Sequence, residues 1–219
     1  RAARNLLRLA LAGNREMEPF RGELVEEAQK VCGIRYGRQQ RKAFNKLLLT
    51  RGVKILTGGP GTGKTSTING MLHAYEIMHP DNIIQLCAPT GRAAQRMSES
   101  TGRTAVTIHR LLDYQPDGLG ANYRNEKNPV DADLVVVDEM SMADIRLFDM
   151  LLAALKTGTK LILVGDINQL ESVGAGSVLN DLMGTSDLFI EKTHLTEVFR
   201  QKGGSPIIDN SQKINEGNI

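Results

Sequence analysis

The chain has 219 residues, of which 41% are apolar, 24% are charged and none is tryptophan. This balance is typical of a globular protein with one large domain, and it argues against a disordered chain, a collagen, a disulfide scaffold or an integral membrane protein. The net charge is only +2, yet residues 1–51 hold twelve Lys or Arg against five Asp or Glu. Such a basic segment is compatible with a polyanionic partner and equally with a solvated basic helix face.

The number and spacing of the cysteines indicate the redox compartment in which the protein works. Cys32 and Cys87 are far apart in the sequence, and neither has a neighbouring cysteine or histidine that would complete a metal site. We expect both thiols to be reduced, which fits a cytoplasmic protein. Because no apolar stretch approaches the length of a transmembrane helix, we expect no membrane contact.

The first fifty residues have helical patterns. Residues 1–33 predict two short helices separated by the Gly13–Pro19 region, and a third helix is predicted from Arg38 to about Thr50. We expect residues 1–35 to form an N-terminal helical segment that leads into a larger domain over residues 36–219.

From residue 53 onward, apolar strands alternate with amphipathic helices. Strands are predicted at Val53–Thr57, Asn82–Ala88, Leu134–Val137 and Lys160–Gly165. The predicted helices end near Met78, span Arg92–Ser98, carry Ile145, Phe148, Leu152 and Leu155 on one face, and lie near Ser177–Met183. Strands that are apolar throughout predict an α/β fold whose mainly parallel sheet is covered by helices on both faces. The polar stretch Tyr114–Pro129 interrupts this alternation and is expected to be a loop or hairpin insertion.

A glycine-rich motif lies between the first strand and its helix. The sequence GGPGTGKT, Gly58 to Thr65, fits the phosphate-loop pattern in the strand–loop–helix context that this motif requires. Glycines allow backbone N–H groups to surround a phosphate, and the N-terminus of the next helix adds positive potential. We expect Lys64 to bridge the β- and γ-phosphates of ATP and the Thr65 hydroxyl to bind Mg²⁺. The full nucleotide-binding set is Gly58, Gly59, Pro60, Gly61, Thr62, Gly63, Lys64, Thr65 and Ser66.

Two carboxylates follow the strand Leu134–Val137. Asp138 and Glu139 come at its carboxyl end, the edge of a parallel sheet at which ligands bind. We expect Asp138 to hold Mg²⁺, through water, and Glu139 to accept the proton of the attacking water. A pair that merely caps the next helix is the alternative, and the phosphate loop ahead of it makes the catalytic interpretation the stronger one.

Two further polar groups follow later strands. Gln169, in LVGDINQLESVGAG, is expected to contact the γ-phosphate or the attacking water, whereas Asp166 is equally well explained as a helix cap. Arg200, in LTEVFRQ, is a candidate for the arginine that stabilises charge on the transferred phosphoryl group.

A basic stretch separates the phosphate loop from the two carboxylates. It holds four arginines and one acidic residue between Arg92 and Arg110, and Thr90 and Gly91 follow the end of a strand just before it. The Thr90 hydroxyl, the backbone N–H groups and Arg92 could therefore contact a sugar–phosphate backbone together. Few aromatic residues are interspersed, so base stacking is not expected to supply most of the affinity.

These motifs, in this order, resemble the first motor domain of superfamily 1 DNA helicases of the RecD type, with a RecA-like fold. The resemblance rests on RQQRKAF, GGPGTGKT, APTGRAAQRM, TGRTAVTIHRLL, VVVDEMSM, LVGDINQLESVGAG and LTEVFRQ, and it covers about residues 34–219. It implies that Gln40 reads adenine, that Thr90, Arg92, His109 and Arg110 contact single-stranded DNA, and that the roles of Asp138, Glu139, Gln169 and Arg200 are those given above.

The resemblance also implies a function for the protein. It predicts 5′-to-3′ translocation on single-stranded DNA, driven by ATP hydrolysis with Mg²⁺ between two RecA-like domains. The second of these domains, an expected partner, is absent, so this piece is expected to bind MgATP, to hydrolyse it poorly and not to unwind DNA. A monomer is the simplest expectation. The Tyr114–Pro129 insertion matches a strand-separating hairpin, while Asn168 and Glu171 depart from the family pattern of Asp and Pro.

Two other function classes remain alternatives. A nucleotide kinase also uses a phosphate loop, but no arginine-rich lid segment follows here. A nucleotide-gated DNA-binding module without productive turnover would carry the same motifs. DNA-stimulated hydrolysis distinguishes the helicase from this module.

Overall fold

The computed structural model describes residues 1–12, 22–49, 52–115, 123–170, 172–186 and 189–198. Its helices are α1 (Ala2–Ala12), α2 (Gly22–Cys32), α3 (Arg38–Leu49), α4 (Lys64–Met78), α5 (Gly91–Thr101), α6 (Ile108–Leu111), the 3₁₀ turn η1 (Met140–Met142), α7 (Ile145–Ala154) and α8 (Val178–Gly184). Its strands are β1 (Val53–Gly58), β2 (Ile84–Ala88), β3 (Ala105–Thr107), β4 (Leu134–Val137), β5 (Lys160–Gly165) and β6 (Glu191–Leu195).

The strands form one parallel sheet in the order β3-β2-β4-β5-β1-β6. All four residues of β4 are buried because the strand is covered on both sides. Val135 and Val137 face one core, and Leu134 and Val136 face the other. A strand with two buried faces has no polar side to alternate with, which explains its continuous apolar run.

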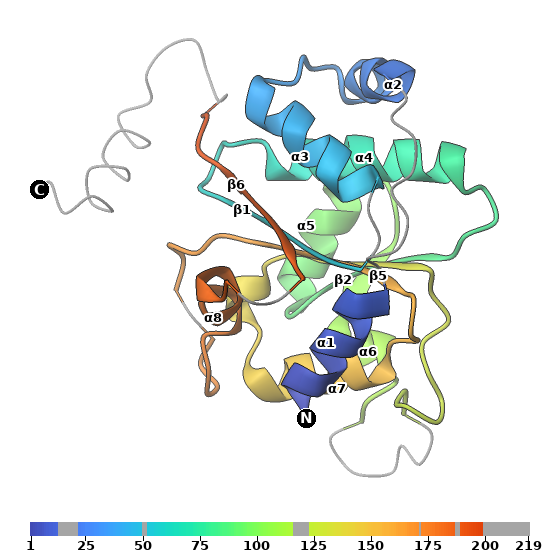
Figure 1. Cartoon of the computed structure of the whole chain (residues 1–219), viewed down its shortest axis with the longest axis vertical. Helices are drawn as coiled ribbons and strands as arrows, with labels where there is room; N and C mark the ends of the chain where they lie inside the picture. The colour runs from blue at the N-terminus through green and yellow to red at the C-terminus, as the bar shows by residue number, and fades with distance from the viewer. Residues whose placement is uncertain (13–21, 50–51, 116–122, 171, 187–188, 199–219) are drawn as a thin grey trace, which may run out of the picture.

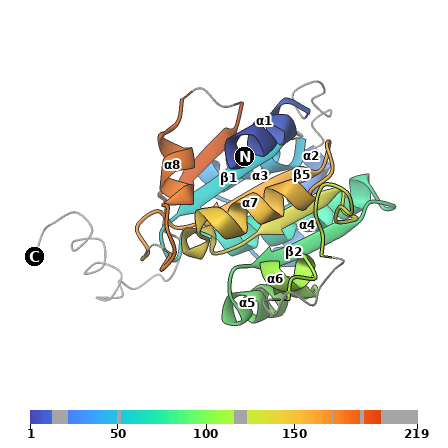
Figure 2. The ribbon, with the colours of Figure 1, turned by 90° about the horizontal axis from the view of Figure 1, so that it is seen from below.

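Helices cover both faces of the sheet (Figures 1 and 2). On one face, α1, α6, α7 and α8 pack around the larger core cluster. On the other, α2, α3 and α4 pack together, and α5 contributes Met97. The helices of the N-terminal segment therefore lie on opposite faces, with α1 against α7 and α2 against α4. The predicted α/β architecture is confirmed.

The predicted elements agree with the structure at the centre of the sheet and depart from it at the edges. The four predicted strands are β1, β2, β4 and β5, and the two helices expected in residues 1–33 are α1 and α2. Strands β3 and β6 and helix α6 were not predicted. Strand β3 has only three residues, and β6, with the sequence EKTHL, is largely polar because it is an edge strand.

One predicted helix face needs correction. Phe148 and Leu152 of α7 are buried as expected, but Ile145 at its first turn is 41% exposed, and Leu155 follows the end of the helix. Asp144 caps α7 by accepting a hydrogen bond from the Leu147 N–H. Ile145 instead lies beside the loop that contains Gly176.

The insertion is described only in part. Residues 116–122 lie outside the described ranges, as does the Gly13–Pro19 region. After the gap, Asn125 and Asn128 form an isolated antiparallel bridge, which is the only hairpin-like pairing in the described part of the insertion. No helix in the described ranges is long and apolar enough to cross a membrane.

Candidate functional site

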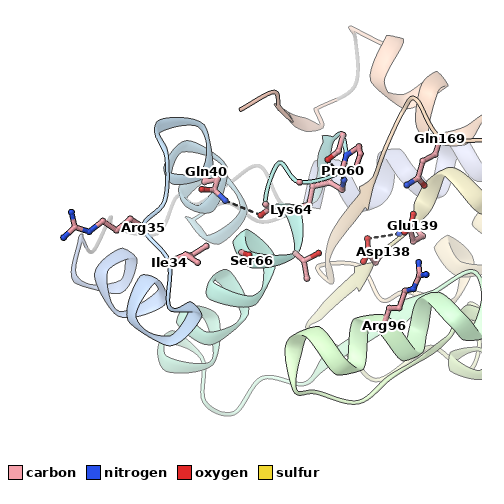
Figure 3. Close-up of a pocket in the computed structure, with 14 residues that line it drawn as sticks. Ile34, Arg35, Gln40, Pro60, Lys64, Ser66, Arg96, Asp138, Glu139 and Gln169 are labelled. Atoms are coloured by element: carbon pink, nitrogen blue, oxygen red, sulfur yellow. Dashed lines mark hydrogen bonds between the residues drawn. The ribbon is translucent and has the colours of Figure 1, made fainter. Parts of the chain in front are cut away.

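A cavity of about 740 Å³ opens at the carboxyl ends of β1, β4 and β5. Parallel sheets bind ligands at this edge because the loops that leave the strands converge there. Figure 3 shows the residues that line it, which are Ile34, Arg35, Gln40, Gly59, Pro60, Gly61, Gly63, Lys64, Thr65, Ser66, Arg96, Asp138, Glu139 and Gln169. The structure therefore brings most of the predicted nucleotide-site residues together.

The phosphate loop joins β1 to α4 in a conformation that requires glycine. Gly61 and Gly63 have φ angles of 79° and 84°, which L-residues other than glycine seldom adopt. A side chain at Gly63 would also meet Gln40, since its Cβ would lie 2.1 Å from the Gln40 Nε2 atom. The buried Thr62 hydroxyl donates a hydrogen bond of 2.8 Å to the Gly59 carbonyl and stabilises the turn.

Lys64 lies inside this loop. Its ammonium donates hydrogen bonds to the carbonyl oxygens of Gly58 (2.5 Å) and Gly59 (3.1 Å). These carbonyl oxygens accept the ammonium hydrogens that the phosphate oxygens of a nucleotide would otherwise accept. A bound triphosphate would replace them with charged oxygens, which are stronger acceptors.

The two carboxylates lie opposite the loop. The backbone N–H of Glu139 donates a 2.8 Å hydrogen bond to the Asp138 carboxylate, and Glu139 itself has a φ of 52°. Burial raises the pKa of Asp138 above its usual value. Burial and the neighbouring Asp138 charge raise the pKa of Glu139. The Lys64 ammonium acts in the opposite direction and lowers the pKa of both carboxyl groups. A half-buried carboxylate with a raised pKa is suited to accept a proton from water.

The donor set of the cavity fits the magnesium ion of a nucleotide. Among the described residues, no group of three His, Cys, Asp or Glu side chains could hold a metal ion alone. Thr65 and Asp138 line the same cavity, and the Lys64 charge acts on the half-buried Asp138 carboxylate. Mg²⁺ usually takes one or two protein ligands and completes its shell with waters and phosphate oxygens.

Gln169 and Asp166 follow β5 and differ in their surroundings. Gln169 lies at the cavity with its Oε1 accepting a hydrogen bond of 3.4 Å from the Ser141 hydroxyl. Asp166 is buried, and its carboxylate accepts a hydrogen bond of 2.9 Å from the Asn168 N–H. Asp166 therefore shapes the turn that presents Gln169 and does not line the cavity, and the turn does not start a helix.

Gln40 lies at the other end of the cavity, on α3. It is only 1% exposed, and its Oε1 accepts a hydrogen bond of 3.0 Å from the Gly37 N–H. Its Nε2 atom is 3.5 Å from the Gly63 carbonyl. The amide thus connects the start of α3 to the phosphate loop, at a place where a base could lie beside it.

The predicted DNA-contacting residues lie outside this cavity. Helix α5 follows β2, and α6 follows β3, the neighbouring parallel strand. The Thr90 hydroxyl accepts a 3.2 Å hydrogen bond from the Ala93 N–H and caps α5, which leaves its own hydrogen available to a ligand. Gly91, Arg92, His109 and Arg110 are exposed. Adjacent strand ends therefore bring the two predicted segments to one side of the sheet.

Several site residues were not predicted from the sequence. Ile34, Arg35 and Arg96 line the cavity. Tyr114 lies 5.7 Å from the His109 ring between centroids, and Tyr123 lies 6.4 Å from Tyr114, so exposed aromatic rings do adjoin the basic segment. Ile34 and Arg35 lie outside the quoted motifs, and Arg96 lies in APTGRAAQRM, for which only DNA contacts were predicted. The two tyrosines lie in the expected insertion, and all of these residues reach their places through tertiary packing. Arg200 lies outside the described residues.

Comparison of the sequence with known proteins shows the family of the chain. A family model described as an AAA domain matches residues 40–175. The chain is 42% identical over 163 residues to the ATP-dependent RecD2 DNA helicase of Deinococcus radiodurans, covering 74% of this chain and 22% of that protein. It is 38% identical over 183 residues to the RecBCD enzyme subunit RecD of Mycolicibacterium smegmatis, covering 74% of this chain and 33% of that protein.

The same fold occurs in a solved structure. The Pif1 helicase from Candida albicans aligns with a TM-score of 0.60 and 24% identity, over 85% of this chain and 45% of that chain. This chain spans between about a fifth and a third of the length of the two curated relatives. The chain is thus similar in sequence to RecD and RecD2 proteins and shares the RecA-like motor fold of the Pif1 structure. From the matched family model, it belongs to the AAA domain family.

Proposed function

We propose that this chain is the first motor domain of an ATP-dependent DNA helicase that moves 5′ to 3′ along single-stranded DNA. The observation that carries the proposal is one cavity that contains Lys64, Glu139 and Gln169 on three different strand ends. A phosphate-binding lysine, a carboxylate base and an amide that reaches the same space are the groups that hydrolysis of a nucleoside triphosphate requires. The name of the Deinococcus relative, an ATP-dependent DNA helicase, supports this reaction.

In the nucleotide site, different residues would bind the phosphates, the metal ion and the attacking water. The loop N–H groups and the start of α4 bind the β-phosphate, and Lys64 moves from its carbonyl acceptors to the phosphate oxygens. Thr65 and, through water, Asp138 would hold Mg²⁺, which would offset the negative charge of the phosphates. Glu139 orients the attacking water and takes its proton. Gln169 contacts the γ-phosphate, and Arg200 is proposed to stabilise its charge in the transition state.

At the base end, Gln40 would position adenine. Its carbonyl is already held by the Gly37 N–H, so its Nε2 atom is the group with hydrogen-bonding capacity to offer. Ile34 and Arg35 line the cavity beside it. An aliphatic side chain and a planar guanidinium suit the two faces of a base.

We place single-stranded DNA across the starts of α5 and α6. The Thr90 hydroxyl hydrogen, the Gly91 N–H and Arg92 would bind phosphates, with Arg110 as a further cation. His109 and the neighbouring Tyr114 offer ring faces to an unpaired base. The described residues include no feature that distinguishes DNA from RNA, and the relatives' names support DNA.

A second RecA-like domain is the proposed partner of the rim of the cavity. Leu170, next to Gln169, is 91% exposed, and Val173 on the same loop is fully exposed. Large apolar side chains in such positions are commonly covered by a partner surface. Closure of two domains over ATP would then alternate their hold on DNA. We propose a monomeric cytoplasmic protein, which agrees with the two free thiols.

Strand separation tests the proposal. The protein at its full natural length should unwind a duplex with a 5′ single-stranded tail when MgATP is present, and it should not unwind one with a 3′ tail. Glu139→Gln is the matched control, since it should bind the same DNA without unwinding it. Unwinding of the 3′-tailed duplex would contradict the polarity. DNA binding that responds to ATP with no unwinding and no turnover would favour a nucleotide-gated binding module.

A further inference from the structure

Arg96 belongs to α5 but faces the nucleotide cavity. Figure 3 shows its side chain extending from α5 toward Asp138 and Glu139. It lines the same cavity as these two carboxylates, and its charge acts on Glu139. The helix that begins at the proposed DNA contact therefore also places a cation beside the proposed catalytic base.

The fold does not require this arginine. Helix α5 packs on the sheet through Ala93, Ala94 and Met97, whereas Arg96 is exposed on another face. Within the described ranges, the Arg96 guanidinium makes no hydrogen bond or close ion pair. A cation held in a cleft without a fixed partner is available to respond to a ligand.

Arg92 and Arg96 lie one helical turn apart on α5. Residues four apart share a helix face, so like charges at these positions repel each other and gain nothing for the helix itself. Both ends of the helix are fixed. Thr90 caps the N-terminus, and Gly102, with a φ of 67°, donates its N–H to the Ser98 carbonyl at the C-terminus. A capped helix of eleven residues moves as a unit, so a shift at Arg92 is a shift at Arg96.

We propose that Arg96 is a positioning residue whose charge draws the Glu139 carboxylate away from the attacking water until DNA binds at the start of α5. This inference rests on the function proposed above. When DNA phosphates bind at Thr90–Arg92, they draw the helix face toward the DNA and away from Glu139. The attraction of Arg96 for the Glu139 carboxylate then weakens, and hydrolysis accelerates. In this way, a single helix couples DNA occupancy to ATP turnover.

The test is the rate of ATP hydrolysis with and without a single-stranded oligonucleotide, in the protein at its full natural length. Arg96→Gln should raise the DNA-free rate at least about fivefold and leave the rate at saturating DNA within about twofold, as expected for a coupling of this size. Affinities for MgATP and for the oligonucleotide, measured separately, should stay within about threefold because Arg96 is not itself a ligand of either.

Three variants complete the design. Arg96→Met, a second neutral substitution with good helix propensity, should behave as Arg96→Gln does. Arg96→Lys keeps the charge, so the ratio of the DNA-stimulated rate to the DNA-free rate should stay close to that of the wild type. Gln95→Ala, at the exposed neighbouring position, should match the wild type. Thermal melting curves confirm that each variant is folded.

Each other outcome overturns the inference. If both neutral variants keep the wild-type ratio, Arg96 does not couple the sites. If they lower both rates, or only the DNA-stimulated rate, Arg96 is part of the hydrolytic site itself. If either affinity falls by more than about tenfold, it is an ordinary ligand. A wild-type protein that DNA does not stimulate would overturn the proposed function and this inference together.

Discussion

Among single residues, Lys64 provides the most direct test of the nucleotide site. Its ammonium is held by the Gly58 and Gly59 carbonyls and would exchange them for phosphate oxygens. Because hydrogen bonds to charged groups contribute about 1.5–3 kcal/mol each, Lys64→Ala should weaken MgATP binding by about 10- to 100-fold. Titration calorimetry with MgATP measures this change. Lys42→Ala, on the exposed side of α3, is the control, and an unchanged affinity in Lys64→Ala would contradict the phosphate-loop assignment.

Glu139 is expected to affect turnover rather than binding. Its carboxylate is half-buried beside Asp138, and both burial and that charge raise its pKa. The Gln substitution keeps the shape of the side chain but cannot accept a proton. Glu139→Gln should therefore retain MgATP affinity and lose about 10²- to 10⁴-fold in hydrolysis rate. Single-turnover measurements separate the two effects, and hydrolysis close to the wild-type rate would show that Glu139 is not the base.

Much of this site could be predicted from the sequence, for a physical reason. A phosphate loop is a contiguous segment, and the two carboxylates directly follow an apolar strand, so local order places them at one sheet edge. Arg96 and Arg35 reach the same cavity only through the packing of α5 and of the segment between α2 and α3. Arg35 lies outside the quoted motifs, and the motif that contains Arg96, APTGRAAQRM, predicts DNA contacts and not a place in the nucleotide cavity.

At the scale of elements, Gly70 shows how closely α4 packs against the N-terminal segment. A Cβ at this position would lie 1.9 Å from the Tyr36 hydroxyl oxygen and 3.0 Å from the Ala28 Cβ. That hydroxyl donates a hydrogen bond of 3.0 Å to the Ser66 carbonyl, so it cannot move without losing a bond near the phosphate loop. Gly70→Ala should lower the free energy of unfolding by about 1–3 kcal/mol through overpacking.

Urea denaturation measures this loss, and two further variants locate its cause. Gly184→Ala introduces the same methyl group where no atom lies within 4 Å, and it should be close to neutral. Removing the hydroxyl in the double variant with Tyr36→Phe should recover part of the stability lost in Gly70→Ala. Equal stability of Gly70→Ala and the wild type would contradict the close packing of α2, α4 and Tyr36.

An ion pair joins α4 to the segment after α5. The Arg103 guanidinium donates two 2.7 Å hydrogen bonds to the Glu76 carboxylate and a third, of 2.9 Å, to the Asn69 side chain. The hydrogen bond from Arg103 lowers the pKa of Glu76 below its usual 4.5. Since the folded-state pKa is the lower one, the pair stabilises the fold above about pH 4.5, and this contribution is lost as pH falls through the folded-state value.

Glu76→Gln should therefore destabilise the protein by about 0.5–1 kcal/mol near pH 7, a modest value because the carboxylate is partly exposed. The difference from the wild type should shrink as the pH falls below about 4.5 and through the lowered pKa of Glu76, because the carboxylate then becomes protonated. Urea denaturation at a series of pH values from 7 downward measures it. Glu99→Gln, at an exposed carboxylate of α5, is the control. A difference that stays the same at low pH would exclude the charge of Glu76 as its cause.

The centre of the fold could be predicted and its edges could not. Strand β4 is apolar throughout and β5 is apolar after Lys160, because both faces of each strand are buried, and an uninterrupted apolar run is readily recognised. Strand β6 alternates little and is half-buried, and β3 is too short to show a period. Strand β6 forms by pairing with β1, and β3 forms by pairing with β2. Such pairing between distant segments leaves no pattern in the local sequence.

For the molecule as a whole, two proposed binding sites lie side by side at the carboxyl edge of the parallel sheet and must communicate. ATP is proposed to bind at the ends of β1, β4 and β5, and DNA is proposed to bind at the starts of α5 and α6, beyond β2 and β3. Helix α5 reaches both sites, through Arg92 and Arg96. By linkage, a helix that transmits DNA binding to the nucleotide site also transmits nucleotide binding to the DNA.

The central claim is that this coupling controls turnover. The most direct measurement is steady-state ATP hydrolysis by the protein at its full natural length, with and without a saturating single-stranded DNA oligonucleotide. We expect DNA to raise the rate at least about tenfold, an effect within the range of coupling free energies between two sites. Equal rates with and without DNA, in a protein that binds both ligands, would contradict the account and leave a nucleotide-binding domain whose turnover is independent of DNA.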